Sequence, residues 1–169
     1  MSRTVTRRSR RPALACALLA ALLFAGVTPA GARKPGPSPD GTLVSQTIAA
    51  FVTAANKGDA PGMTATFADA PTVVLNLPPY RWNGTGAIKH FAADVAHART
   101  AQGATDVFLT LNPNKAMFLG GSHAYVSVPA TYAYKQKGHP VTEDGVLVFA
   151  LDKIAGAWKI TSLTWGAVR

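Results

Sequence analysis

The sequence contains a single cysteine, Cys16, among its 169 residues. One cysteine excludes an internal disulfide and any zinc site built from several thiolates. Charged side chains are also scarce, at 15 % of the chain, whereas hydrophobic residues make up 48 %. That balance is typical of a folded globular chain and excludes a disordered one. The length suits one ordinary domain and is too short for a two-domain cofactor enzyme.

Acidic residues are missing from the first 32 positions, where five arginines precede residue 12. Much of the formal net charge of +9 therefore belongs to the N-terminus; without these five arginines, twelve basic and eight acidic residues leave a net charge of +4. The remaining basic residues are scattered singly, without the aromatic–basic interleaving of a nucleic-acid-binding stripe. The composition thus predicts no nucleic-acid partner.

The arginines are followed by an apolar run, residues 12–26, and then by small residues that end at Ala32. This order predicts a secretory signal peptide of bacterial type over residues 1–32. The run is shorter than the ~20 residues that span a bilayer, so we expect no stable membrane insertion after cleavage. We therefore predict an exported protein, periplasmic or secreted, with a linker at residues 33–40 and one domain at residues 41–169. The choice between the general secretory and twin-arginine routes stays open.

Three helices are predicted in the first half of that domain, from apolar residues at helical spacing. They cover residues 41–56, 60–67 and 86 to about 100. Asp40 is the expected N-cap of the first helix, which should end at Gly58 because glycine adopts the left-handed cap conformation. Thr85 is the expected N-cap of the third.

A run of β-branched residues predicts a strand over residues 72–77, ended by two prolines. After residue 100 apolar and polar side chains alternate, which predicts five more strands joined by turn residues. They cover residues 105–111, 115–119, 124–135, 141–151 and 157–165. Pro129 within one of them indicates a bulge or a sheet edge at that point. Helix, helix, strand, helix and an antiparallel meander together indicate an α+β fold.

Several short phrases resemble the nuclear transport factor 2-like superfamily, above all its SnoaL-like and ketosteroid-isomerase-like bacterial branches. They lie at residues 56–59, 67–69, 83–88 with Phe91, and 156–160, and they follow one another in the family's order. The resemblance covers roughly residues 41–168. It implies a conical half-barrel, in which three N-terminal-half helices pack on a strongly curved, mainly antiparallel sheet with an apolar pocket at its open end. It also implies a homodimer paired through the outer sheet face, where Tyr125, Pro129 and Thr131 are expected.

The isomerase branch uses a carboxylate base together with a tyrosine and a protonated acid that stabilise an oxyanion. Aligned motif by motif, the tyrosine, base and buried-acid positions fall on Phe51, Leu75 and Leu147. All three are apolar, so no catalytic residue of that branch carries over. Whether the chain is an enzyme at all stays open.

What the resemblance does imply is a pocket for a small hydrophobic ligand, bound with few hydrogen bonds and without a cofactor. Nothing in the sequence is expected to orient an acidic ligand there. The predicted ligand-binding residues are Phe51, Met63, Phe67, Leu75, Phe91, Tyr132, Leu147, Thr161, Leu163 and Trp165.

Two alternatives remain open beside ligand binding. In the first, the chain is a cofactor-independent lyase, isomerase or cyclase that acts on a hydrophobic substrate with Glu143 as base. Its neighbour Asp144 should point to the other sheet face, so the two form no dyad unless Gly145 bulges. In the second, the chain is a non-catalytic scaffold whose pocket is filled.

One pattern suggests a metal site, because His90, Asp94 and His97 follow one another at helical spacing. The histidines are two turns apart, about 10.5 Å of rise, which is too far for one shared ion. Ile88 and Phe91 mark the opposite side of the helix as the core face. We therefore predict a solvated face and no metal.

Overall fold

The computed structural model describes residues 38–113 and 115–168, and the predicted signal peptide lies outside these ranges. All the described helices and strands belong to one compact unit. In chain order they are α1 (Pro39–Lys57), α2 (Ala60–Thr66), β1 (Phe67–Val74), β2 (Arg81–Asn83), α3 (Ala87–Gln102), β3 (Ala104–Leu111), β4 (Ala116–Gly120), β5 (His123–Gln136), β6 (His139–Ile154) and β7 (Ala157–Ala167).

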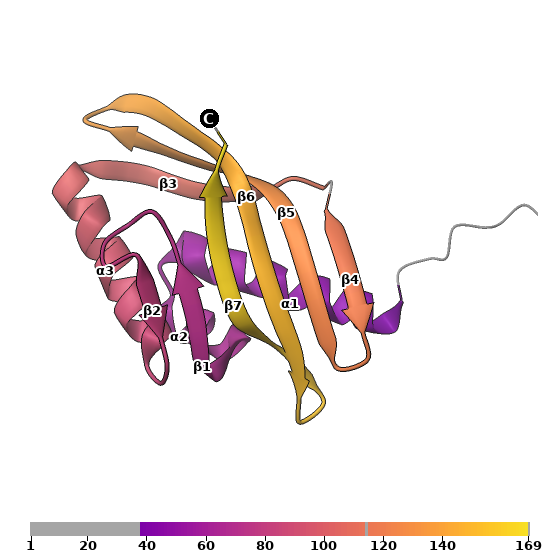
Figure 1. Cartoon of the computed structure of the whole chain (residues 1–169). Coiled ribbons are helices and arrows are strands. Elements are labelled where there is room, and N and C mark those ends of the chain that lie inside the picture. Colours follow the sequence, from indigo (N-terminus) through magenta and orange to yellow (C-terminus); the bar gives the residue numbers. More distant parts are fainter. Residues whose placement is uncertain (1–37, 114, 169) are drawn as a thin grey trace, which may run out of the picture. The chain divides into compact units, whose positions relative to one another are not determined.

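The strands form one sheet in the order β2-β1-β7-β6-β5-β3 (Figure 1). The remaining strand, β4, pairs with β5 on the same side as β3 but along a different stretch of it. Neighbours are antiparallel except for β1 and β7, which run parallel. The helices pack against one face of this sheet, and no pairing joins β2 to β3 or β4 among the described residues, so the sheet is not closed. The predicted α+β class, three helices on a mainly antiparallel sheet, is confirmed.

The core forms where the apolar face of the helices meets the apolar face of the sheet, because residues three or four apart share a helix face and residues two apart share a strand face. On α1, Val44, Ile48 and Phe51 follow one another at helical spacing and are buried. The Phe51 ring meets Phe67 and Phe149 edge-on, with centroid distances of 5.5 and 6.0 Å. This aromatic contact fixes the middle of α1 against the centre of the sheet.

Pro129 occupies the edge position that its missing N–H requires. The N-terminal part of β5, residues 123–127, pairs with β4, and residues 130–136 pair with β3. Pro129 lies between these two stretches, while its pairing with Val146 on β6 continues without a shift. Pro129 thus lies in a gap between two pairings on the same side of β5, where no ladder hydrogen bond needs its N–H, and β5 shows no bulge toward β6.

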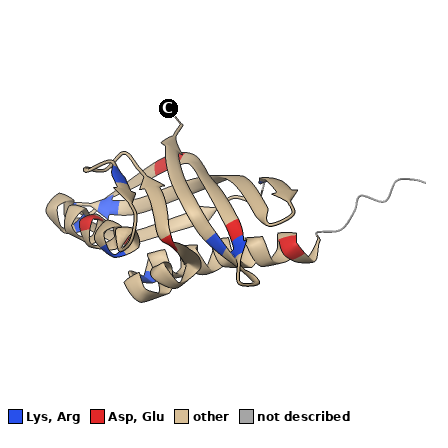
Figure 2. Ribbon diagram, turned by 60° about the horizontal axis from the view of Figure 1, so that its bottom comes forward, with Lys and Arg blue, Asp and Glu red and all other residues tan. Residues whose placement is uncertain are grey.

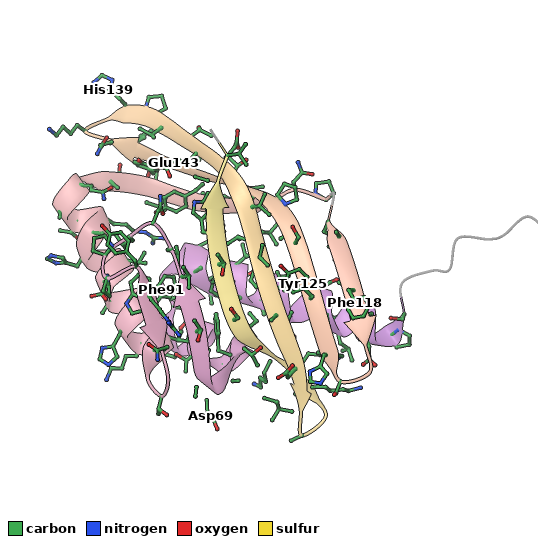
Figure 3. All side chains as sticks on the ribbon, viewed as in Figure 1. Asp69, Phe91, Phe118, Tyr125, His139 and Glu143 are labelled. Carbon is green, nitrogen blue, oxygen red and sulfur yellow. The ribbon has the colours of Figure 1, made fainter. Side chains whose placement is uncertain are left out.

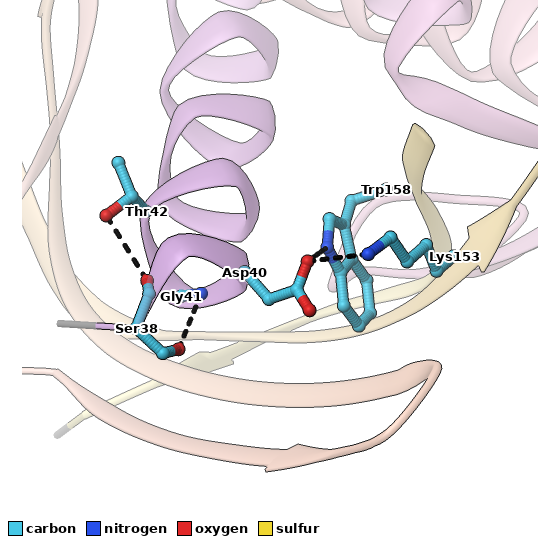
Figure 4. Close-up of polar contacts among 6 residues, drawn as sticks. All are labelled: Ser38, Asp40, Gly41, Thr42, Lys153 and Trp158. Carbon is cyan, nitrogen blue, oxygen red and sulfur yellow. Dashed lines mark hydrogen bonds and ion pairs between the residues drawn. The ribbon is translucent and has the colours of Figure 1, made fainter. Parts of the chain in front are cut away.

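The first helix begins earlier than predicted, and the N-cap is Ser38 rather than Asp40. The Ser38 Oγ accepts a hydrogen bond from the Gly41 amide at 3.0 Å (Figure 4). Pro39 then starts the helix, because proline has the required φ and lacks an N–H that the first turn would leave unpaired.

Asp40 instead fastens the first turn of α1 to the β6–β7 hairpin. Its Oδ1 accepts hydrogen bonds from Lys153 Nζ at 2.8 Å and from the Trp158 indole at 3.0 Å (Figure 4). The Lys153 hydrogen bond and, after it, that of Trp158 hold the pKa of Asp40 below its usual value.

Other predicted boundaries shift because tertiary pairing overrides local propensity. Phe67, expected at the end of the second helix, is the first residue of β1 and pairs with Ile160 on β7. That strand ends at Val74 rather than at residue 77, and the short edge strand β2 was not predicted. Gly86, not Thr85, precedes α3, with φ 80° and no side-chain cap. None of the helices that the structure describes has the length and apolarity to cross a membrane.

Candidate functional site

A cavity of about 220 Å³ lies between α1, α3 and the concave helix-bearing side of the sheet. Its floor consists of the buried residues Phe51, Phe91, Leu147 and Leu163. Leu75, Val95 and Trp165 are half-buried and form part of its walls. An apolar cavity of roughly 150 Å³ can hold benzene, so the space suits a molecule of one or two rings.

Seven of the ten predicted ligand-binding residues line this cavity. They are Phe51, Leu75, Phe91, Tyr132, Leu147, Leu163 and Trp165. The three positions equivalent to the isomerase catalytic groups, Phe51, Leu75 and Leu147, are among them. The cavity is therefore apolar at the places where that branch carries its acids and tyrosine, while ligand binding by these residues stays a prediction.

The other three predicted residues lie elsewhere. Met63 lines a second hollow between α2 and α3, and Phe67 is buried against Phe51. Thr161 is the extra residue where the β6–β7 register shifts, since Ala150 pairs with residue 162 and Leu151 with residue 160. Its hydroxyl donates to the Ala150 carbonyl at 3.2 Å. A bulge of this kind interrupts strand alternation, which a sequence pattern cannot locate.

The structure adds a group of polar residues that sequence patterns alone do not bring together. At one side of the cavity the lining residues are half-buried or exposed, and we call Arg99, Gln102, Tyr132, Tyr134 and Glu143 the mouth. Arg99 Nε donates to the Tyr132 hydroxyl at 3.2 Å. The Tyr132 and Tyr134 rings are 5.5 Å apart, and the Tyr134 hydroxyl donates to Glu143 Oε1 at 3.1 Å.

This arrangement follows from strand register. Tyr132 and Tyr134 are two residues apart on β5 and therefore share a face, and Glu143 on β6 pairs directly with Tyr132. Figure 3 shows Glu143 on β6, near the end that overhangs β3 and α3. Burial and, after it, the hydrogen bond to Glu143 raise the pKa of Tyr134. The phenol therefore stays protonated and remains a donor to Glu143.

The two adjacent acids on β6 point to opposite faces, as predicted. Glu143 lines the cavity, whereas Asp144 accepts a hydrogen bond from Thr131 Oγ1 at 2.7 Å and is exposed. Gly145 pairs in register with Ala130 on one side and Ala167 on the other, without a bulge. Glu143 and Asp144 consequently form no carboxylate dyad.

Asn56 also lines the cavity, but its amide is committed to the fold. Its Nδ2 donates to the Leu109 carbonyl at 2.9 Å, and its Oδ1 accepts from the Leu109 amide at 2.8 Å. The side chain thereby pairs with β3 as a neighbouring strand would. It ties the end of α1 to the sheet rather than offering both polar groups to a ligand.

The helical triplet on α3 does not form a metal site. His90 and His97 are exposed, and Asp94 accepts a hydrogen bond from the Trp82 indole at 2.7 Å. Among the described residues no group of three metal-ligating side chains gathers anywhere. The role of Asp94 is structural, because it satisfies the only polar group of a buried tryptophan.

Charged residues outside the cavity are dispersed. Figure 2 shows lysines, arginines and acids distributed over several helices and strands rather than gathered in one stripe. Tyr125 and its β4 partner Phe118 are exposed on the outer face of the sheet (Figure 3). The homodimer and the absence of a nucleic-acid partner stay predictions.

Comparison with known proteins identifies the fold and a family. A family model described as a SnoaL-like domain matches residues 44–164. A protein of unknown function from Mycobacterium tuberculosis is similar in structure, with a TM-score of 0.64, 16 % identity, and coverage of 76 % of this chain and 71 % of that one. No curated protein matches the chain.

Two further solved structures are similar at comparable distance. A ketosteroid isomerase-like protein from Erwinia carotovora atroseptica gives a TM-score of 0.61 at 16 % identity, covering 76 % of this chain and 95 % of that one. The protein Aln2 from a Streptomyces species gives 0.63 at 19 % identity, with coverage of 79 % and 94 %. At these identities the likeness establishes the fold alone.

Proposed function

Because the chain belongs to the SnoaL-like domain family, we propose that it is an exported protein that binds a small hydrophobic molecule in its cavity, without a cofactor. The observation that carries this proposal is the combination of an apolar floor and a polar mouth in one cavity of about 220 Å³. Binding sites of this kind take most of their affinity from apolar walls and their orientation from a few polar groups.

In the bound complex the rings of the ligand pack against Phe51, Phe91 and Leu163. Its polar atoms face the mouth, where the Tyr132 hydroxyl contacts Arg99 and the Tyr134 hydroxyl contacts Glu143. The alternative of a scaffold with a filled pocket predicts no ligand at all, so a binding experiment separates the two.

The test is native mass spectrometry on the protein purified from the compartment to which it is exported, followed by thermal unfolding with a panel of aromatic and alicyclic compounds. A bound molecule, or a raised melting temperature, supports binding, since a ligand of the folded state must stabilise it. An apo mass together with no shift from any compound refutes the proposal and leaves the scaffold.

Two neighbouring substitutions on β6 provide a matched control. Leu147→Phe narrows the floor and should reduce the ligand-induced shift, whereas Val148→Phe alters the opposite face of the same strand and should leave it unchanged. Equal effects of the two variants would indicate that the ligand binds outside the cavity.

One observation favours a second candidate, a lyase, isomerase or cyclase with Glu143 as general base. Glu143 faces the cavity, and the Tyr134 hydroxyl occupies only its Oε1, which leaves Oε2 to approach a substrate. With a substrate in hand, Glu143→Gln should abolish turnover while the ligand still binds. An unchanged rate in Glu143→Gln would rule out this role.

A further inference from the structure

Arg99 is the only lysine or arginine among the described residues that line the cavity. It lies in the last turn of α3, half-buried, with its guanidinium 6.0 Å from the centroid of the Tyr132 ring. Its Nε is used by the hydrogen bond to Tyr132. Among the described residues no carboxylate forms an ion pair with Arg99, and Glu143 accepts a hydrogen bond from Tyr134 instead.

Arg99 is half-buried beside apolar walls and has no counter-ion, an environment that favours an anion at its guanidinium. The unused N–H groups of arginine form a planar fork that matches the two oxygens of a carboxylate. The Tyr132 hydroxyl accepts from Arg99, so its own hydrogen is available to a second acceptor. Arginine and phenol thus offer donors side by side at the mouth.

We propose that Arg99 and Tyr132 bind the carboxylate of a small organic acid whose ring fills the apolar floor. This inference rests on the proposed function and names the class of its ligand. It also revises the expectation from sequence that nothing orients an acid in the pocket. Glu143 is the strand partner of Tyr132 and repels an anion bound there, while its hydrogen bond with Tyr134 keeps one of its oxygens engaged. The acid group is therefore bound on the Arg99 side.

The test compares ring carboxylates with their neutral amides, which have nearly the same shape. Benzoate, 2-naphthoate and indole-3-acetate, each beside its amide, are titrated into the purified protein by calorimetry at neutral pH. We expect each acid that binds to bind more tightly than its amide. Arg99→Gln should weaken 2-naphthoate about ten- to a hundredfold and change 2-naphthamide by no more than about twofold, since only the charged hydrogen bonds are lost.

Two variants control for charge and for folding. Lys89→Gln removes the same charge from the same helix but from outside the cavity, and it should leave both affinities unchanged. Tyr132→Phe removes the neutral donor and should weaken 2-naphthoate by about two- to tenfold. The melting temperature of each free variant shows that the fold is intact.

The outcomes distinguish the acid-binding inference from the proposed hydrophobic pocket. If amides bind but acids bind no better, or if the preference for acids survives Arg99→Gln, the acid-binding inference is wrong and the hydrophobic pocket stands. If an equal loss of acid affinity follows Lys89→Gln, the acid responds to charge at long range or binds in the second hollow, which Lys89 and Arg99 both line, and the assignment to Arg99 and Tyr132 in the cavity fails. If no compound of either series binds, the acid-binding inference is refuted, and the native mass and the thermal panel decide whether the pocket binds any ligand.

Discussion

Substituting alanine for Gly145 tests how tightly the cavity wall is built. Gly145 is buried on β6, directly under the indole of Trp165, which lines the cavity. A Cβ at this position would overlap Trp165 Cζ2 and would lie 2.6 Å from the Gly166 carbonyl oxygen. The second distance is about 1 Å short of van der Waals contact. The indole can rotate, but the carbonyl belongs to the β6–β7 pairing and cannot move without disturbing it.

Overpacking of this kind costs about 1–3 kcal/mol, so the melting temperature of Gly145→Ala should fall by at least about 3 °C. Because Trp165 must shift, its fluorescence and the affinity for any cavity ligand should change as well. The measurement is thermal and urea unfolding followed by tryptophan emission.

Gly166→Ala is the matched control, since a Cβ there meets only the Val146 carbonyl, at 4.0 Å. It should alter stability by no more than about 0.5 kcal/mol. If Gly145→Ala were as stable as Gly166→Ala, the close packing of Trp165 over Gly145 would be disproved.

Two further predictions concern pH. Because the pKa of Asp40 is lowered in the folded state, its contribution to stability is present above about pH 4 and is lost as the pH falls through the folded value. Asp40→Asn should therefore be less stable than the wild type at neutral pH, and the two should become equally stable in acid. A constant difference between them in urea unfolding across that range would contradict the reasoning. Because the pKa of Tyr134 is raised in the folded state, its contribution to stability is complete below about pH 10 and is lost as the pH rises through the folded value. Tyr134→Phe should lower the free energy of unfolding by about 1 kcal/mol or less at neutral pH, because the hydrogen bond to Glu143 is lost, and this difference should shrink in strong alkali.

The order of elements could be predicted because it depends on local patterns. Gly58 ends α1 in the left-handed conformation, and the alternation after residue 100 marks five strands that the structure contains. The predicted ends of helices and strands were wrong where pairing with a distant segment sets the boundary. Phe67 leaves the helix because β7 is available to pair with it, and β2 exists only as a three-residue neighbour of β1.

The floor of the cavity was predictable for the same reason, since buried apolar residues repeat with the period of their element. The mouth was not. In the sequence Arg99 is only a cation near a helix end, and Tyr134 is one more residue of a long strand. Both line the cavity because β5 passes the end of α3, where Arg99 donates to Tyr132. Thr161 was misplaced because the bulge that holds it has no signature in the sequence.

The catalytic and acid-binding hypotheses predict different effects of Glu143→Gln, one on turnover and the other on ligand affinity, so this variant tests both. As a general base, Glu143 is needed for turnover, and its loss in Glu143→Gln leaves ligand affinity nearly unchanged. As the only carboxylate among the described lining residues, it repels an organic acid bound at Arg99, and its loss should tighten that binding. Both effects can hold in one protein, because a base and a carboxylate-binding site can contact different parts of the same ligand. If the wild type turns over a substrate and Glu143→Gln does not, and the variant binds 2-naphthoate more tightly, both hypotheses are supported; weaker binding would exclude repulsion at the mouth.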